Sequence, residues 1–223
     1  MNICTSARVA GMGYAFTGVA DDGSAIEYNP AGLYRINEYY MSIMHLNLGP
    51  EVMYEYINGA LDTKYGTIGL GLSFIHLGEE EDVSTGFDYL DFMSSLVYSR
   101  EIYPNFSLGS AFKFFNSTIG EYSTSSVIFD FGALYGFKFL DLTGLNEPNM
   151  YVGASFKNIG STFEYGSAQE APPLTQRYGL SYKISETMTI ASDAIKEANV
   201  PMKFGFGIEN ITGKILNLRL GYQ

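Results

Sequence analysis

The sequence has few of the residues on which most functional sites depend. Its 223 residues include no tryptophan, one cysteine and two histidines. A single cysteine excludes an internal disulfide framework and a cysteine-rich metal site. Charged residues make up only 17% of the chain, and a formal net charge of −11 argues against nucleic acid as a partner. No stretch approaches the roughly 18 consecutive apolar residues that a transmembrane helix needs.

Catalytic motifs are missing as well. His45 and His76 have no neighbouring metal-ligand pattern, so we expect structural roles for both. The chain contains neither the Gly-x-Ser-x-Gly nor the His-Glu-x-x-His motif. Residues 11–13 begin like a dinucleotide-binding fingerprint, but Phe16 occupies the third glycine position and no predicted strand precedes it. We therefore expect no enzyme, no metal site and no cofactor.

Two acidic stretches suggest cation binding only weakly. Asp21, Asp22 and Gly23 match a fragment of a calcium-binding loop whose remaining acidic positions are missing. The run from Glu79 to Asp82 contains four carboxylates and falls in a long predicted loop. We expect that loop to be solvated, with binding of divalent cations at a cell surface as the alternative.

The first 37 residues differ from the rest of the chain. Ser24 and Glu27 have the spacing of a capping box, which predicts a short helix. That helix should end at Asn29, because a residue before proline avoids the helical region. Pro30 is suited to the first turn of a second short helix.

From residue 38 onward, apolar residues recur with a period of two, which is typical of strands with one apolar face. For example, Ile68, Leu70 and Leu72 alternate with small residues. Most of the predicted strands have the 9–11 residues that a tilted strand needs to cross a bilayer. Long and short connections largely take turns, as they do in outer-membrane barrels. The eleven predicted strands span residues 38–48, 51–58, 66–76, 89–100, 106–116, 126–140, 150–158, 177–184, 187–194, 202–210 and 214–222.

The second face of these strands is rich in glycine, which weakens a solvated strand but suits a crowded barrel interior. Tyrosines near the strand ends fit an aromatic girdle. We therefore predict an all-β, antiparallel transmembrane β-barrel, and the alternative is a soluble β-sandwich with aromatic cross-strand pairs. Ionisable residues expected to face the lumen, as ion pairs or along a polar path, are Lys113, Asp130, Lys138, Lys183, Asp193, Lys203, Glu209 and Arg219.

Three N-terminal stretches carry a family resemblance. Residues 7–16, 20–25 and 28–33 resemble the N-terminal signature of FadL-like outer-membrane proteins, and are closer to the branch that contains PorV and PorQ of the type IX secretion system. Residues 152–160 and 172–180 are similar to that branch's pattern of a strand, Asn-hydrophobic-Gly, Pro-Leu and the next strand. Residues 206–209 and 218–222 resemble its late strands.

The resemblance implies an outer-membrane barrel of about fourteen strands with a short helical plug in its lumen. Residues 1–37 would form the plug-like segment, and residues 38–223 a barrel that is incomplete at its C-terminus, because bacterial barrels have even strand numbers. The chain start has neither a basic nor an apolar signal region, so we expect its signal peptide to be missing. The plug motif carried over from the family consists of Asp21, Asp22, Asn29, Pro30, Ala31 and Gly32.

The family resemblance also implies function. FadL-type proteins pass hydrophobic compounds, whereas PorV-type members serve protein secretion and surface attachment. We expect transport of small hydrophobic compounds across the cell outer membrane, with a secretion or surface-assembly component as the alternative and a soluble binding module as a third hypothesis. The expected partners are the lipid bilayer, a hydrophobic ligand or secretion-system proteins.

Overall fold

The computed structural model describes residues 3–49, 52–77, 89–140, 147–165, 168–212 and 216–223. Three short helical elements precede all the strands: α1 (Ala7–Gly11), α2 (Ala25–Tyr28) and the 3-10 helix η1 (Pro30–Arg35). The strands are β1 (Tyr39–Asn47), β2 (Val52–Thr63), β3 (Gly66–Leu77), β4 (Tyr89–Tyr103), β5 (Phe106–Ile119), β6 (Tyr122–Phe137), β7 (Met150–Gly160), β8 (Phe163–Tyr165), β9 (Ala168–Glu170), β10 (Thr175–Lys183), β11 (Met188–Glu197), β12 (Lys203–Thr212) and β13 (Leu216–Tyr222).

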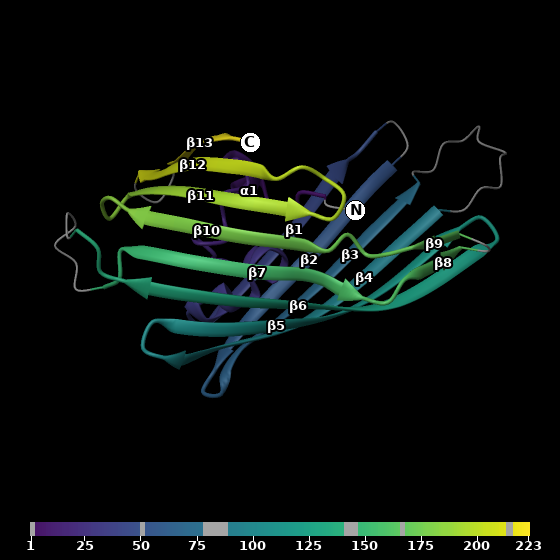
Figure 1. The fold of residues 1–223 in the computed structure, drawn as a ribbon, viewed down its shortest axis with the longest axis horizontal. Coiled ribbons are helices and arrows are strands. Elements are labelled where there is room, and N and C mark those ends of the chain that lie inside the picture. The colour runs from purple at the N-terminus through teal and green to yellow at the C-terminus, as the bar shows by residue number, and fades with distance from the viewer. Residues whose placement is uncertain (1–2, 50–51, 78–88, 141–146, 166–167, 213–215) are drawn as a thin grey trace.

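Eleven strands form one antiparallel sheet in the order β1-β2-β3-β4-β5-β6-β7-β10-β11-β12-β13. Strands β8 and β9 form a separate hairpin within the connection from β7 to β10 (Figure 1). The predicted all-β antiparallel class is therefore confirmed, and so are eleven strands in the sheet. The sheet is not closed, because the described parts of β1 and β13 are its two edges and do not pair with each other.

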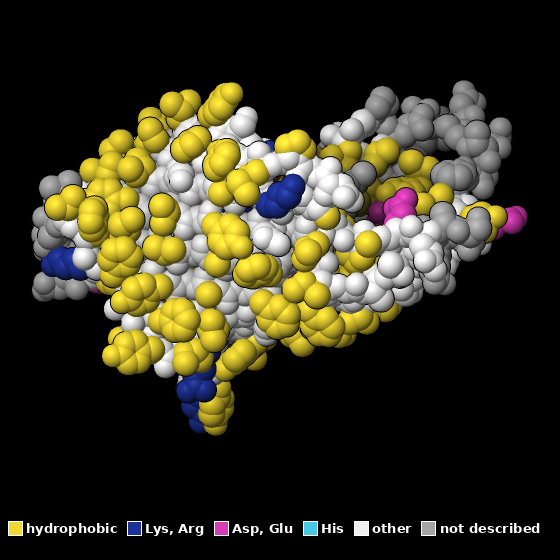
Figure 2. All heavy atoms as spheres, in the orientation of Figure 1, with side chains coloured by type: hydrophobic (Ala, Val, Ile, Leu, Met, Phe, Trp, Pro, Cys, Tyr) yellow, Lys and Arg dark blue, Asp and Glu magenta, His cyan; other side chains and the backbone are white. Residues whose placement is uncertain are grey.

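The burial of side chains alternates along each strand, with the apolar residues on the outside. In β3, Leu70 is 60% exposed, whereas the neighbouring Gly69 and Gly71 are buried. Figure 2 shows hydrophobic side chains spread across the outer surface of the sheet, with few charged groups among them. Large apolar residues more than a third exposed on this surface include Ile57, Ile68, Leu72, Leu96, Leu108, Phe112, Phe114, Phe129, Phe131, Val152, Phe156, Leu180, Phe204, Phe206, Ile208 and Leu218.

The N-terminal segment (residues 3–37) lies within the curve of the sheet, against its inner face (Figure 1). Its apolar side chains form the main core of the protein, and Val9, Met12, Phe16, Ile26 and Leu33 are completely buried. In a β-sandwich, a second sheet would occupy this place. Among the described residues no such sheet exists, so the sandwich alternative does not describe this fold.

Several predicted boundaries are wrong. The connection predicted to be long, residues 117–125, is a tight turn, because β5 continues to Ile119 and β6 begins at Tyr122. Polar side chains extend this hairpin by bonding across it: the Asn116 amide donates to the Thr124 carbonyl at 3.1 Å. Gly120 supplies the left-handed conformation of the turn, with φ of 58°.

The short helices differ from the prediction in their details. The second one, η1, begins at Pro30 as expected, and Asn29 is its N-cap. The predicted capping box does not form at α2, because Ser24 makes no side-chain capping bond and Glu27 bonds to Lys113 instead. Helix α1 was not predicted, because its five residues are too few to show a period of 3.6. Within the described residues, no helix is both long and apolar enough to cross a membrane.

Candidate functional site

Glycines on the inner face allow the N-terminal segment to lie directly on the strand backbones. A Cβ atom at Gly109 would lie 2.3 Å from the carbonyl carbon of Pro30, and one at Gly153 would lie 2.1 Å from the carbonyl oxygen of Thr17. Both separations are steric overlaps, so a larger residue at either position would push the segment away. The glycine-rich face therefore contacts protein backbone, which explains why it is not covered with larger polar side chains.

The motif that includes Asn29 and Pro30 is one tightly packed turn. The Asn29 side chain is fully buried, donates to the carbonyl of Thr17 at 2.8 Å and accepts from the Ala31 amide at 3.2 Å. The Ala31 carbonyl accepts hydrogen bonds from the hydroxyls of Ser99 at 2.9 Å and Ser107 at 2.8 Å. These bonds tie η1 to strands β4 and β5.

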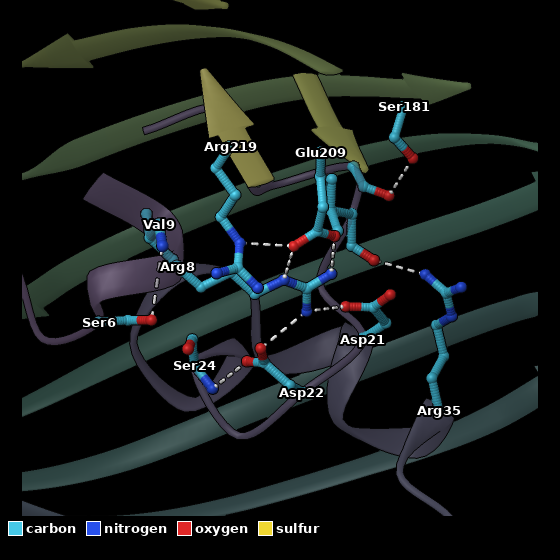
Figure 3. A network of polar contacts seen from close by, with 12 residues as sticks. Ser6, Arg8, Val9, Asp21, Asp22, Ser24, Arg35, Ser181, Glu209 and Arg219 are labelled. Carbon is cyan, nitrogen blue, oxygen red and sulfur yellow. Dashed lines mark hydrogen bonds and ion pairs between the residues drawn. The ribbon is translucent and has the colours of Figure 1, made fainter. Parts of the chain in front are cut away.

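A second anchor is the ion-pair network around Arg8, shown in Figure 3. The Arg8 guanidinium, on α1, lies 2.5 Å from Asp21, 2.7 Å from Asp22 and 2.6 Å from Glu209 on β12. Arg219 on β13 donates to the other oxygen of Glu209 at 2.6 Å. Glu209 is only 2% exposed, so two cations compensate one buried carboxylate. The network joins the N-terminal segment to the last two strands of the sheet.

The charge of Arg8 changes the titration of the N-terminal acids. Burial acts to raise the pKa of Asp21, but attraction to Arg8 and Arg35, together with the Arg8 hydrogen bond, outweighs burial and holds that pKa below its usual range. Burial likewise acts to lower the pKa of Arg8, and its carboxylate partners reverse the effect and raise it. Both groups are therefore charged at neutral pH.

A third anchor lies where Thr17 meets β10 and β11. The Asp193 carboxylate, 1% exposed, accepts hydrogen bonds from the Thr17 amide at 3.0 Å and the Thr17 hydroxyl at 2.5 Å. Arg177 donates to this carboxylate at 3.0 Å and to the Tyr14 carbonyl at 2.6 Å. A carboxylate and an arginine thus hold a backbone turn of the segment against the sheet.

The fourth anchor is a buried triad. The Lys113 ammonium, on β5, lies 2.9 Å from Glu27 of α2 and 2.8 Å from Asp130 of β6. All three side chains are nearly inaccessible to solvent. Since a buried ion pair is costly unless fully compensated, this triad places α2 in one position over the sheet.

The structure brings most of the residues expected in the lumen to the inner face. Lys113, Asp130, Asp193 and Glu209 are buried there and contact the N-terminal segment or its ion pairs. Others lie at the margins of the same face: Arg219 and Lys183 are half-buried, and Lys203 is exposed at the start of β12.

Lys138, also expected to face the lumen, lies just beyond the end of its strand. It follows Phe137, the last residue of β6, and is exposed, since β6 ends three residues before the predicted boundary at residue 140. His45, on the outer side of β1, pairs with Glu55 at 2.7 Å. The acidic run from Glu79 to Asp82 lies outside the described residues.

Several interior ionic residues escaped the prediction. Arg177 and Lys157 occupy the same face of their strands as Gly179 and Ser155, so the period of two was a signal that could have found them. Arg8 and Glu27 come from the N-terminal segment, where no periodicity distinguishes a partner of the sheet from a surface charge.

A cavity of about 380 Å³ lies between the N-terminal segment and the inner face of the sheet, and Phe163 of β8 also lines it. Thr5, Tyr14 and Tyr28 line it from the segment, and Asp91 and Lys157 line it from β4 and β7. Its volume falls within the range of small-molecule sites, roughly 300–1,000 Å³. In the described part of the chain, no group of three histidine, cysteine, aspartate or glutamate side chains is placed to hold a metal ion.

The fold thus defines an all-β protein in which one large antiparallel sheet encloses its own N-terminal segment, with polar contacts inside and apolar side chains outside. Residues 1–215 match the model of the uncharacterised protein family UPF0164, and the chain belongs to that family. No curated protein matches the chain.

Proposed function

We propose that this protein is an outer-membrane β-barrel protein that passes small hydrophobic compounds, with its N-terminal segment acting as a plug. The single observation that carries the proposal is the inverted distribution of side chains over the sheet. Apolar residues such as Leu70 and Phe206 are more than half exposed, while lysine, aspartate and glutamate are buried inside.

An apolar outer face is costly for a protein in water. Exposed apolar area costs about 25 cal/mol per Å² relative to its burial, and soluble monomers rarely expose large contiguous apolar patches. In lipid the same face is in its preferred environment, and an interior with polar groups is tolerated. Strand lengths support this interpretation, since β2 and β3 have 12 residues each, enough to cross a bilayer at a tilt.

The N-terminal segment supports the gating part of the proposal. It fills the interior with completely buried residues, so a compound that enters the cavity meets the segment before it reaches the opposite end. Ionic and polar contacts around Glu209, Asp193 and Lys113 join the segment to the sheet, in addition to its apolar core.

Reconstitution into liposomes tests the proposal. A folded membrane barrel should show a heat-dependent gel shift. Liposomes that contain the protein should take up a small apolar compound such as 3-methylindole faster than empty liposomes do. Glu209→Gln removes one charge that anchors the segment and should raise uptake further, whereas Glu121→Gln in an exposed turn should not. A protein that is soluble and monomeric without detergent would contradict the proposal.

A secretion or surface-assembly role is the second candidate. The observation that favours it is the number of ionic anchors on the N-terminal segment, which suit an interior that stays filled. A membrane-inserted protein that admits no compound, either as wild type or as Glu209→Gln, would favour this role. Co-purification with secretion-system proteins or cargo would then be the decisive measurement.

A further inference from the structure

The two ends of the sheet differ in charge. Since neighbouring strands are antiparallel and follow one another along the chain, successive connections join them at alternate ends. The connections at one end, called the acidic end below, contain nine aspartate or glutamate residues and no lysine or arginine. They are residues 48–51, 78–88, 120–121, 161–174 and 198–202. The connections at the opposite end contain three acidic and three basic residues. The acidic end therefore attracts cations.

The cavity reaches the acidic end, where Phe163 and Pro173 line it. Asp91, the third residue of β4, lines it as well. The Oδ2 atom of Asp91 accepts from the Tyr89 hydroxyl at 2.8 Å, whereas its Oδ1 atom is buried without a partner. Among the described residues, no lysine or arginine forms an ion pair with this carboxylate. A carboxylate without a counter-charge in a partly apolar cavity is costly.

The strand register places a second unpartnered oxygen next to Asp91. Ser117 of β5 lies directly opposite Asp91, is 1% exposed, and has a hydroxyl without a hydrogen-bond partner. On the other side of Asp91, Ile75 of β3 lies opposite it, and Tyr54 of β2 lies opposite Ile75. These four residues form one row across the inner face. Because opposite residues have Cβ atoms about 5 Å apart, Asp91 and Ser117 can contact the same ligand group.

Aromatic rings lie beside this row. Phe115, two residues before Ser117 on the same face, lines the cavity, and its ring centre lies 5.0 Å from that of Phe163. Tyr54 lines the cavity as well. Aromatic rings attract cations through their faces and also pack against apolar groups. A carboxylate with rings around it therefore favours a cation that is attached to an apolar body.

The other charged groups on the cavity wall are distant from Asp91 along the sheet. Lys113 lies four residues before Ser117, which is roughly 13 Å along β5 at about 3.3 Å per residue. Its ammonium group already pairs with Glu27 and Asp130. The remaining charged residues of the wall belong to strands three or more positions from β4 in the sheet, and they are Lys157, Arg177, Glu197 and Lys203.

We infer that the part of the cavity around Asp91 binds a small organic cation with an apolar body, whose ammonium group donates hydrogen bonds to Asp91 and Ser117. An ammonium group has three donors and no acceptor, so it can satisfy both unpartnered oxygens. A neutral compound would leave the charge of Asp91 uncompensated, and an anion would be repelled by it. The inference rests on the proposed transport function, to which it adds the charge of the preferred compound.

The absence of tryptophan from the chain makes a direct test available, because indole fluorescence then comes only from the ligand. Three probes share one indole body: tryptamine is a cation, 3-methylindole is neutral, and indole-3-propionate is an anion. Binding to the full chain in non-ionic detergent micelles is measured by the change in probe fluorescence, with protein-free micelles as the background. We expect tryptamine to bind about tenfold or more tightly than either of the other probes.

Variants assign the selectivity to the row around Asp91. Asp91→Asn should lower the affinity for tryptamine to that for 3-methylindole and leave the affinity for 3-methylindole unchanged. Ser117→Ala removes the second oxygen and should lower the affinity for tryptamine by a smaller factor. Asp62→Asn makes the same substitution as Asp91→Asn at an exposed position near the opposite end of the sheet, and should leave all three affinities unchanged.

These variants separate a local site from general attraction to the acidic end. If the acidic connections alone attract the cation, Asp91→Asn should bind tryptamine as tightly as the wild type does, and that result would overturn the inference. Equal affinities of the wild type for all three probes, or no binding of any, would overturn it as well. The comparison of probes on the wild type decides the matter even if Asp91→Asn does not fold.

The two proposals fail in different experiments. Selective binding of tryptamine without uptake of any probe into liposomes would retain the cation site and reject transport. Uptake of 3-methylindole without selective binding of tryptamine would retain transport and reject the cation site.

Discussion

The Arg8 guanidinium donates two hydrogen bonds to the Glu209 carboxylate, at 2.9 Å and 2.6 Å, across a separation of 201 residues. This contact connects the beginning of the chain to β12. Because Arg219 also donates to Glu209, the carboxylate is the centre of the network. It is therefore the position at which a small change should loosen the N-terminal segment most.

Glu209→Gln should lower the free energy of unfolding by about 1.5–3 kcal/mol, the usual effect of losing hydrogen bonds to a charged group. In this variant Arg8 still forms its ion pairs with Asp21 and Asp22, so the N-terminal segment should remain folded. Urea unfolding in detergent micelles measures the change. Glu121→Gln makes the same substitution in an exposed turn and should stay within about 0.5 kcal/mol of the wild type. Equal effects of the two variants would contradict the central role of Glu209.

Stability should fall at acid pH partly through Asp21. Its pKa in the folded protein lies below the unfolded value of about 4, because Arg8 and Arg35 outweigh the effect of burial. The stabilisation is therefore complete above about pH 4 and is lost as the pH falls through the lower folded-state pKa. Urea midpoints of wild type and Asp21→Asn, measured from neutral pH downwards, should converge at acid pH. A constant difference between them would refute this account.

Gly109→Ala should destabilise the protein by about 1–3 kcal/mol, the usual cost of overpacking. The added Cβ would lie 2.3 Å from the carbonyl carbon of Pro30, so either η1 or β5 must shift. At Gly49 an added Cβ would have no atom within 4 Å, which makes Gly49→Ala the matched control. We expect no loss of stability in the control, as measured by the midpoint of urea unfolding.

Asn29→Ala should lower the free energy of unfolding by about 0.5–2 kcal/mol, because the N-cap of η1 is lost. The loss of the other buried hydrogen bonds of Asn29 should lower it further. The Thr17 carbonyl would lose its 2.8 Å donor. Asn47→Ala removes the same side chain from an exposed position of β1 and should have little effect. Thermal unfolding followed by circular dichroism compares the two variants, and an Asn29→Ala protein as stable as the wild type would show that the motif is not structural.

The period of two was enough to predict the sheet. Alternation in segments such as 66–76 and 202–210 depends only on neighbouring residues, and it correctly separated outer apolar positions from inner glycine and polar ones. The strand ends were harder to predict. The turn at Gly120 lies among serine and threonine residues, which resemble a loop in composition but extend the hairpin through cross-strand bonds.

The class of fold could be predicted from the order of residues alone, and so could the face on which Lys113, Asp130, Asp193 and Glu209 lie, because both follow from local alternation. The partners of these charges depend on the folded arrangement instead. Arg8 meets Glu209 and Glu27 meets Lys113 because the curvature and register of the sheet bring distant positions together around the N-terminal segment. The same register brings Tyr54, Asp91 and Ser117 from three strands into one row, a relationship that no local pattern contains.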